Sequence, residues 1–340
     1  MDQAQGKLAM LVPRIATTTA FARVPILASA ALIALYGVAS LTPAYARKAP
    51  PPIASWHYQL QNINLTALSQ TDTDLLVIDY AETPADGPMV PFTKSEIERL
   101  KTKPYGGRRI VLSYLSIGEA ERYRFYWKAE YAKARPAWLV GPSKGWPGNY
   151  RVRYWIDEWT DIIVRGQGSY LDRILDAGFD GVYLDGLGKY AGLTAERPDA
   201  GQAMMTLVKE IADTARKHNP DFIVVAQNAE ELLQDADYRA TIDAIAKEDY
   251  LYGDNGDGSR NSDENVRLSR ENLKLIQSEG KMVLVAEYLS DPVNQSVARA
   301  EIERDGFIPI FVRRDLDGPT LDQSKKDPSL TGNIGGRQLQ

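Results

Sequence analysis

The sequence predicts a (β/α)8 TIM barrel, formed by a single domain at residues 56–317. Eight short apolar stretches alternate here with helical patterns, as expected for parallel strands that are buried on both faces. Nearly every stretch ends on an acidic or amide side chain, at the position where barrel enzymes carry their active sites. A doubly wound open sheet would show the same alternation and is the alternative.

The N-terminus has the pattern of an export signal at residues 1–46. Two arginines precede an apolar run at 24–41, and the small-residue site Ala44-Tyr45-Ala46 follows, which predicts cleavage before Arg47. An uncleaved anchor is the alternative, because a run of this length is near the lower limit for crossing a bilayer. Cleavage would give a secreted or periplasmic protein with no membrane contact. Residues 47–55 are expected to form a proline-rich linker.

The composition indicates a folded globular protein, since 44% of the residues are hydrophobic and 25% are charged. The absence of cysteine excludes disulfides, thiolate metal ligands and thiol nucleophiles. Without residues 1–46 the chain has 37 Lys and Arg against 44 Asp and Glu, a formal charge of −7. This balance disfavours nucleic acid as a partner and is compatible with a neutral or cationic ligand. We expect a monomer.

The elements follow in a regular order. The expected strands are 56–60, 75–80, 110–115, 182–185, 223–227, 244–248, 282–287 and 308–312. The expected helices are 93–103, 119–135, 157–177, 199–218, 229–240, 262–279 and 292–305. A ninth strand-like run at 152–155 is expected in an insertion between the third and fourth strands, or it replaces the first or the last strand. The polar residues 318–340 are expected to form a flexible tail.

Acidic and amide side chains gather at the ends of the expected strands. They are Asp79, Glu119, Asp185, Asn228 with Glu230, Glu248 and Glu287, and the last strand is followed by Arg313-Arg314-Asp315. A single acid can cap the next helix, and this alternative stays open for Asp79 and Glu230. Six or more converging acids would repel one another, so they indicate an acid–base task, a cationic ligand or a metal ion.

Tyrosines accompany these acids. Tyr58, Tyr80, Tyr114, Tyr250 and Tyr288 lie in or directly after the expected strands. Aromatic rings stack on sugar faces, and carboxylates bind hydroxyl and amino groups, so the combination favours a carbohydrate ligand. Packing in the core is the alternative for Tyr114.

Other chemistries find little support in the sequence. With only two histidines, His57 and His218, a zinc hydrolase and a Ser-His-Asp triad are disfavoured. The chain has no Gly-rich dinucleotide motif and no Walker loop, so we expect no cofactor. The acid-rich run 254–263 departs from the spacing of a calcium loop and is expected to be a solvated turn, so no metal site is assigned.

Asp185 and Glu248 are the expected catalytic pair for glycoside hydrolysis. Each ends an apolar strand directly, without the pattern of a helix cap. One carboxyl group would protonate the leaving oxygen, while the other acts as nucleophile or as base toward water. The expected substrate contacts are Tyr58, Asp79, Tyr80, Tyr114, Glu119, Asn228, Glu230, Tyr250, Glu287, Tyr288 and Arg313.

Six motifs give the chain a family resemblance from about Trp56 to Asp317. They are VIDY (77–80), SYLSIGEAERYRFYW (113–127), GFDGVYLDGLGKY (178–190), AQNAEEL (226–232), AKEDYLY (246–252) and IFVRRDLD (310–317). The chain thereby resembles glycoside hydrolase family 114, the endo-α-1,4-polygalactosaminidase family, and especially its exported bacterial and archaeal branch.

The resemblance implies a barrel glycosidase that cleaves α-1,4-linked galactosamine polymers. Its catalytic Asp and Glu would fall on Asp185 and Glu248, and a cationic amino sugar would explain the rim of acids. The chain departs from the expected pattern at Gly186-Leu187-Gly188, where a further acid or amide would follow Asp185. The alternatives are a non-catalytic polysaccharide-binding barrel involved in exopolysaccharide handling and an acid-lined site for a divalent ion.

Overall fold

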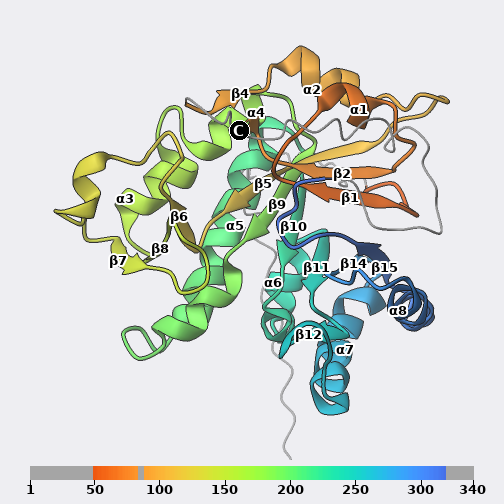
Figure 1. The fold of residues 1–340 in the computed structure, drawn as a ribbon. Helices are drawn as coiled ribbons and strands as arrows, with labels where there is room; N and C mark the ends of the chain where they lie inside the picture. Colours follow the sequence, from red (N-terminus) through yellow and green to blue (C-terminus); the bar gives the residue numbers. More distant parts are fainter. Residues whose placement is uncertain (1–48, 83–87, 319–340) are drawn as a thin grey trace, which may run out of the picture. The chain divides into compact units, whose positions relative to one another are not determined.

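Eight parallel strands form one sheet that nearly closes into a barrel, with helices on its outer face (Figure 1). This computed structural model describes residues 49–82 and 88–318. The predicted export signal at 1–46, the first two linker residues and the predicted tail beyond Gly318 lie outside the described residues. The (β/α)8 fold predicted from the sequence is confirmed.

The barrel strands have the same order in the sheet as in the chain. They are β1 (Trp56–Gln59), β2 (Leu75–Ile78), β5 (Ile110–Ser116), β9 (Gly181–Asp185), β10 (Ile223–Gln227), β11 (Ala244–Glu248), β14 (Met282–Glu287) and β15 (Ile308–Phe311). The Trp56 indole N–H donates to the Ile308 carbonyl at 3.0 Å and so joins the first strand to the last. All eight predicted strands are confirmed, and the open-sheet alternative is wrong.

Helices connect most of these strands. They are α1 (Leu65–Ser69), α2 (Lys94–Leu100), α4 (Tyr170–Asp176), α5 (Ala200–His218), α6 (Ala236–Thr241), α7 (Asp263–Ser278) and α8 (Pro292–Arg304). Thr93 and Glu96 form a capping box at the start of α2, and Ser262 caps α7. The short helix α1, which Asn64 caps, was not predicted.

The segment between β5 and β9 forms a small antiparallel sheet beside the barrel (Figure 1). Its strands are β6 (Glu119–Glu121), β7 (Leu139–Pro142) and β8 (Asn149–Val152), so the strand-like run predicted at 152–155 begins where β8 ends. The helix predicted at 119–135 is wrong, because Glu119–Glu121 pairs with β8 and only η1 (Ala129–Ala132) is helical. Pairing with a distant strand overrides the helix propensity of Glu and Ala.

Two further helix predictions are only partly right. The segment predicted at 157–177 contains α3 (Asp157–Thr160) and the π-helical turn η2 (Asp161–Arg165), and the chain then turns before α4. The segment predicted at 229–240 starts as the 3-10 helix η4 (Glu230–Gln234) before α6. The remaining elements are η3 (Leu187–Leu193) and two hairpins, β3 (Ala81–Glu82) with β4 (Val90–Pro91) and β12 (Tyr252–Gly253) with β13 (Gly256–Arg260).

Successive residues of each barrel strand belong to two different buried layers. In β2, Leu75 and Val77 pack inside the barrel, whereas Leu76 and Ile78 pack against the helices. Aromatic rings fill much of the interior, and the ring centroids of Tyr58 and Tyr183 are 4.9 Å apart. This alternation decides which side chain at the end of each strand enters the barrel mouth.

Candidate active site

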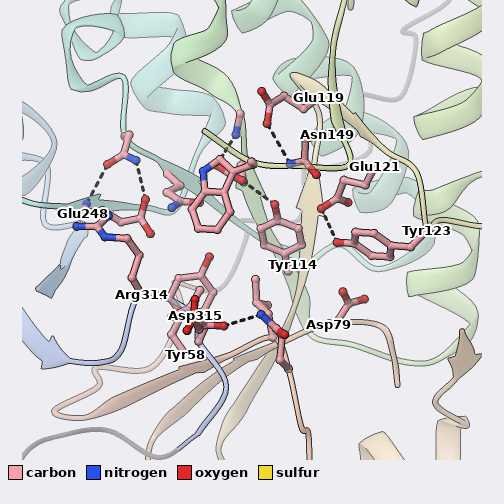
Figure 2. Close-up of a pocket in the computed structure, with 18 of the residues that line it drawn as sticks. Tyr58, Asp79, Tyr114, Glu119, Glu121, Tyr123, Asn149, Glu248, Arg314 and Asp315 are labelled. Carbon is pink, nitrogen blue, oxygen red and sulfur yellow. Dashed lines mark hydrogen bonds between the residues drawn. The ribbon is translucent and has the colours of Figure 1, made fainter. Parts of the chain in front are cut away.

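A cavity of about 630 Å³ opens at the carboxyl ends of the barrel strands, with a volume typical of sites for small ligands. All eight strands, or the residues just after them, contribute to its wall. Tyr58, Asp79, Tyr114 and Glu248 are among the lining residues drawn in Figure 2. Eight of the predicted site residues line it: Tyr58, Asp79, Tyr114, Glu119, Asp185, Asn228, Glu248 and Tyr288.

Asp185 lies at the end of β9 and accepts two hydrogen bonds. Tyr114 Oη donates to Oδ2 at 2.6 Å, and the backbone N–H of Gly186 donates to Oδ1 at 2.5 Å. Burial, followed by the negative charge of Glu248, raises the pKa of Asp185 to about 6, although both hydrogen bonds act to lower it. Glu248 therefore lies near enough to Asp185 for its charge to affect the protonation of Asp185.

Glu248 lies at the end of β11, and two donors point at its carboxylate. Tyr288 Oη donates to Oε1, and Asn228 Nδ2 donates to Oε2 at 3.0 Å. The Asn228 Oδ1 atom in turn accepts from the Glu248 backbone N–H at 2.9 Å, so the amide is held at both ends.

The backbone around Asp185 requires glycine at two positions that meet in space. A Cβ on Gly118 would lie 2.0 Å from the Gly186 carbonyl oxygen, and Gly186 itself has a φ of +81°. Ile117 also donates its N–H to the Asp185 carbonyl at 2.9 Å. This contact joins the SYLSIGEAE and GFDGVYLD segments and explains why glycine follows Asp185 where an acid or amide was expected.

A buried ion cluster forms the wall beside β2. Arg124 Nη1 donates to Asp79 at 2.7 Å, and its Nε donates to Glu121 at 2.6 Å. The Tyr123 hydroxyl donates to the other oxygen of Glu121 at 2.6 Å (Figure 2). Asp79 is thus paired with a buried cation, and the helix-cap alternative for it is wrong, since Thr93 caps the next helix.

The inserted sheet forms another part of the wall. Glu119 on β6 accepts hydrogen bonds from Ser143 and from Asn149, the latter at 3.2 Å (Figure 2). Lys189, on the 3-10 helix η3 that follows β9, makes an ion pair with Glu119 at 2.9 Å. Trp146, between β7 and β8, lines the cavity with half of its surface exposed.

Five predicted site residues do not line the cavity: Tyr80, Glu230, Tyr250, Glu287 and Arg313. Side chains alternate between the two faces of a strand, so a residue at an odd spacing from an inward residue faces outward. Tyr80 follows the inward Val77 by three positions, and Glu287 and Arg313 directly follow the inward residues Ala286 and Val312.

Each of these five residues has another partner. Tyr80 packs on Tyr170, and Tyr250 donates its hydroxyl to Asp305 at 2.7 Å. Glu230 makes an ion pair with Lys247, and Arg313 donates to Asp317 at 2.8 Å. Glu287 accepts the Leu251 N–H at 2.7 Å. Their assignment as substrate contacts is therefore corrected.

Several residues that line the cavity were not predicted: Gln61, Asn62, Glu82, Glu121, Tyr123, Trp146, Asn149, Lys189, Gln227 and Arg314. Gln227 and Arg314 could have been found from the period of two, because they follow the inward residues Val225 and Val312 by two positions. Glu121 and Tyr123 were hidden by the helix expected at 119–135.

The cavity carries an excess of negative charge. Its described wall contains seven acids, namely Asp79, Glu82, Glu119, Glu121, Asp185, Glu248 and Asp315, against Lys189 and Arg314. Both cations are already paired with carboxylates. Within residues 49–82 and 88–318, no three His, Cys, Asp or Glu side chains are grouped so that they could hold a metal ion.

Comparison with protein families decides the class of this barrel. The family model of glycoside-hydrolase family GH114 matches residues 38–326, which is most of the chain. The chain belongs to glycoside-hydrolase family GH114. This GH114 barrel is a glycoside hydrolase, and the resemblance inferred from the six motifs is confirmed.

Relatives of this GH114 protein occur in distant organisms. An uncharacterized protein of Thermotoga maritima is 33% identical over 281 residues, covering 78% of this chain and 82% of the relative. A protein of Deinococcus radiodurans is also 33% identical, covering 83% and 88%. One of Methanocaldococcus jannaschii is 34% identical, covering 77% and 76%.

Two solved structures share the fold of the GH114 barrel. Aspergillus fumigatus Ega3 in complex with galactosamine has a TM-score of 0.58 at 19% identity, covering 80% of this chain and 96% of its own. The glycoside hydrolase domain of PelA from Pseudomonas aeruginosa has a TM-score of 0.58 at 16% identity, covering 79% and 98%. No helix in the described part of the chain is long and apolar enough to cross a membrane.

Proposed function

We propose that this GH114 protein is an exported glycosidase that cleaves an amino-sugar polysaccharide of the α-1,4-galactosamine type, with Asp185 and Glu248 as its catalytic carboxylates. The observation that carries the proposal is that both carboxylates line one cavity, where burial and next the charge of Glu248 raise the pKa of Asp185 to about 6. Below that pH Asp185 carries a proton that it can donate to a leaving oxygen. Both mechanisms of glycoside hydrolysis use one protonated carboxyl group together with a second carboxylate.

The charge of the cavity supports a cationic sugar as the substrate. Seven acids line the described wall, whereas Lys189, Arg314 and the buried Arg124 are the cations beside them, so negative charge is in excess and an ammonium group would offset it. Tyr58 and Trp146 offer aromatic faces in the same wall. That Ega3, a protein of the same fold, was crystallised with galactosamine agrees with this choice.

The proposal is tested with purified protein and partly deacetylated polygalactosamine, by measuring the release of reducing ends. We expect Asp185→Asn and Glu248→Gln each to lose activity by about 100-fold or more, because each removes one of the two proton-transfer or nucleophilic groups. Circular dichroism and thermal unfolding show whether each variant remains folded.

Asp176→Asn is the matched control, because it removes an exposed carboxylate from α4, away from the cavity. Its activity should equal that of the wild type. Full activity of Asp185→Asn would contradict the assignment of the pair. A wild-type protein that binds the polymer but leaves it intact after long incubation would instead be a non-catalytic polysaccharide-binding barrel.

Export is the second part of the proposal. It rests on the apolar run at 24–41 and the Ala44-Tyr45-Ala46 site in the sequence. N-terminal sequencing of the protein collected outside the cytoplasm should start at Arg47. Gel filtration of the same sample tests the expected monomer.

A further inference from the structure

Arg314 is held above the ring of Tyr288 by two carboxylates. Its guanidinium carbon lies 4.0 Å from the centroid of the Tyr288 ring. Its Nη1 and Nη2 donate to the two carboxylate oxygens of Asp249 at 3.1 and 2.8 Å, and Nε donates to Asp257 at 2.7 Å. Two parallel bonds to one carboxylate fix the plane of the guanidinium group.

Two partners of Arg314, the Tyr288 ring and Asp249, are directly connected to Glu248. The Tyr288 hydroxyl donates to Glu248 Oε1, and Asp249 is the next residue in the chain after Glu248. Asp249 has a φ of +52°, and its backbone N–H donates to the Ala286 carbonyl at 3.1 Å. Glu248 is therefore connected to Arg314 both through an aromatic ring and through its own backbone.

The carboxylate of Asp249 occupies space that is free only because residue 253 is a glycine. A Cβ on Gly253, the last residue of β12 in the β12–β13 hairpin, would lie 2.1 Å from Asp249 Oδ1. The same hairpin supplies Asp257. Arg314 thus joins the end of β11, the β12–β13 hairpin and the segment after β15 at one point of the cavity wall.

A cation over the Tyr288 ring affects its hydroxyl group. Burial, and next the charge of Glu248, raise the pKa of Tyr288, so the hydroxyl keeps the proton that it donates, while Arg314 lowers this pKa. A cation on the face of the ring also attracts the ring itself and restricts its orientation.

We propose that Arg314 is a positioning residue that orients Tyr288 toward Glu248 and so holds this carboxylate in its reactive geometry. The inference rests on the proposed role of Glu248 and adds a residue that acts through another side chain. It also gives the β12–β13 hairpin a role in the activity, because Asp257 fixes one end of the guanidinium group.

The test is a double-mutant cycle in which kcat and KM for partly deacetylated polygalactosamine are measured. We expect Arg314→Gln and Tyr288→Phe each to lower kcat about 10- to 100-fold while KM stays within about threefold. The double variant should be no slower than the slower single variant, because both changes act on one hydrogen bond. Arg314→Lys, which keeps a cation over the ring, should restore part of kcat.

Arg313→Gln is the matched control, since its side chain pairs with Asp317 outside the cavity, and its kinetics should not change. Two results would overturn the inference. One is an increase of KM without a change of kcat in Arg314→Gln, and the other is a fold-reduction of kcat in the double variant that equals the product of the reductions in the two single variants. Glu248→Gln is assayed alongside. If it keeps full activity, the proposed function fails and the inference with it, whereas an inactive Glu248→Gln with multiplying effects overturns only the role of Arg314.

Discussion

The hydrogen bond from Tyr114 to Asp185 is one of the contacts that affect the pKa of this proposed catalytic acid. This bond lowers the pKa of Asp185, against the larger effect of burial that raises it to about 6. If the protonated acid is required, kcat/KM of the wild type falls as the pH increases through about 6. Tyr114→Phe removes the donor, so the pKa of Asp185 rises and this alkaline limb moves to higher pH. The profile is measured between about pH 4 and about pH 9.

Tyr190→Phe is the control for this change. Tyr190 donates its hydroxyl to Glu231 at 2.6 Å and does not line the cavity, so its pH profile should match the wild type. A limb that stays in place or moves to lower pH in Tyr114→Phe would argue against this role of the hydroxyl.

Glu287 makes stability depend on pH. It is fully buried, and burial raises its pKa from the ordinary 4.5 to about 8. The unfolded chain releases this proton at a lower pH than the folded protein does. The stability that protonated Glu287 contributes to the folded protein is therefore complete below about pH 4.5 and is lost as the pH rises to about 8.

Glu287→Gln should remove this part of the pH dependence. Thermal unfolding is measured at a series of pH values. Between about pH 5 and about pH 8 the Tm of the variant, minus that of the wild type, should increase, because only the wild type loses stability through Glu287. Glu158→Gln changes an exposed acid in the same way, and the difference in Tm between this variant and the wild type should be the same at every pH. A constant difference for Glu287→Gln as well would show that Glu287 is ionised in the folded protein.

At the scale of elements, the barrel depends on the contact between the loops that follow β5 and β9. Gly118→Ala would place a Cβ 2.0 Å from the Gly186 carbonyl oxygen, so one of the two loops must move. We expect a loss of about 2 kcal/mol or more in the free energy of unfolding, measured with urea. Gly188→Ala is the matched control, because nothing lies within 4 Å of its Cβ, and its stability should stay near that of the wild type.

The inserted sheet and β2 are joined by Arg124, whose side chain is 0% exposed. Arg124→Met keeps most of the volume but leaves Asp79 and Glu121 buried without their cation. The cost is expected to be about 3 to 5 kcal/mol in the free energy of unfolding. Arg122→Met, at an exposed position of the same segment, should cost little. Similar losses in both variants would mean that the buried ion cluster does not stabilise the fold.

At the scale of the whole molecule, charge should govern binding of the substrate. The acidic cavity attracts a cationic polymer, and salt screens this attraction. In the inactive Asp185→Asn variant, we expect the Kd for deacetylated oligomers to rise about tenfold between about 50 and about 500 mM NaCl. The Kd for fully acetylated oligomers, measured in the same titration calorimetry series, should change little. Equal salt dependence for both ligands would contradict a cationic substrate.

The sequence alone determined the elements of the barrel and the carboxylates at their ends. Strand 223–227 is a short run of mostly apolar, β-branched or small residues, 244–248 begins with Ala-Ile-Ala, and the cap at Thr93 is a local motif, so neighbouring residues are enough to predict these features. Asp185 and Glu248 were found because each is the last residue of an expected strand.

Only the tertiary structure decided which of these side chains share the cavity. Parallel barrel strands are buried on both faces, so the sequence does not reveal which of two alternating sets points inward. For this reason Arg313 was chosen where Arg314 lines the wall, and Glu287 was included although it faces outward. Glu121 was hidden because pairing between β6 and β8 depends on residues about thirty positions apart, which no local pattern records.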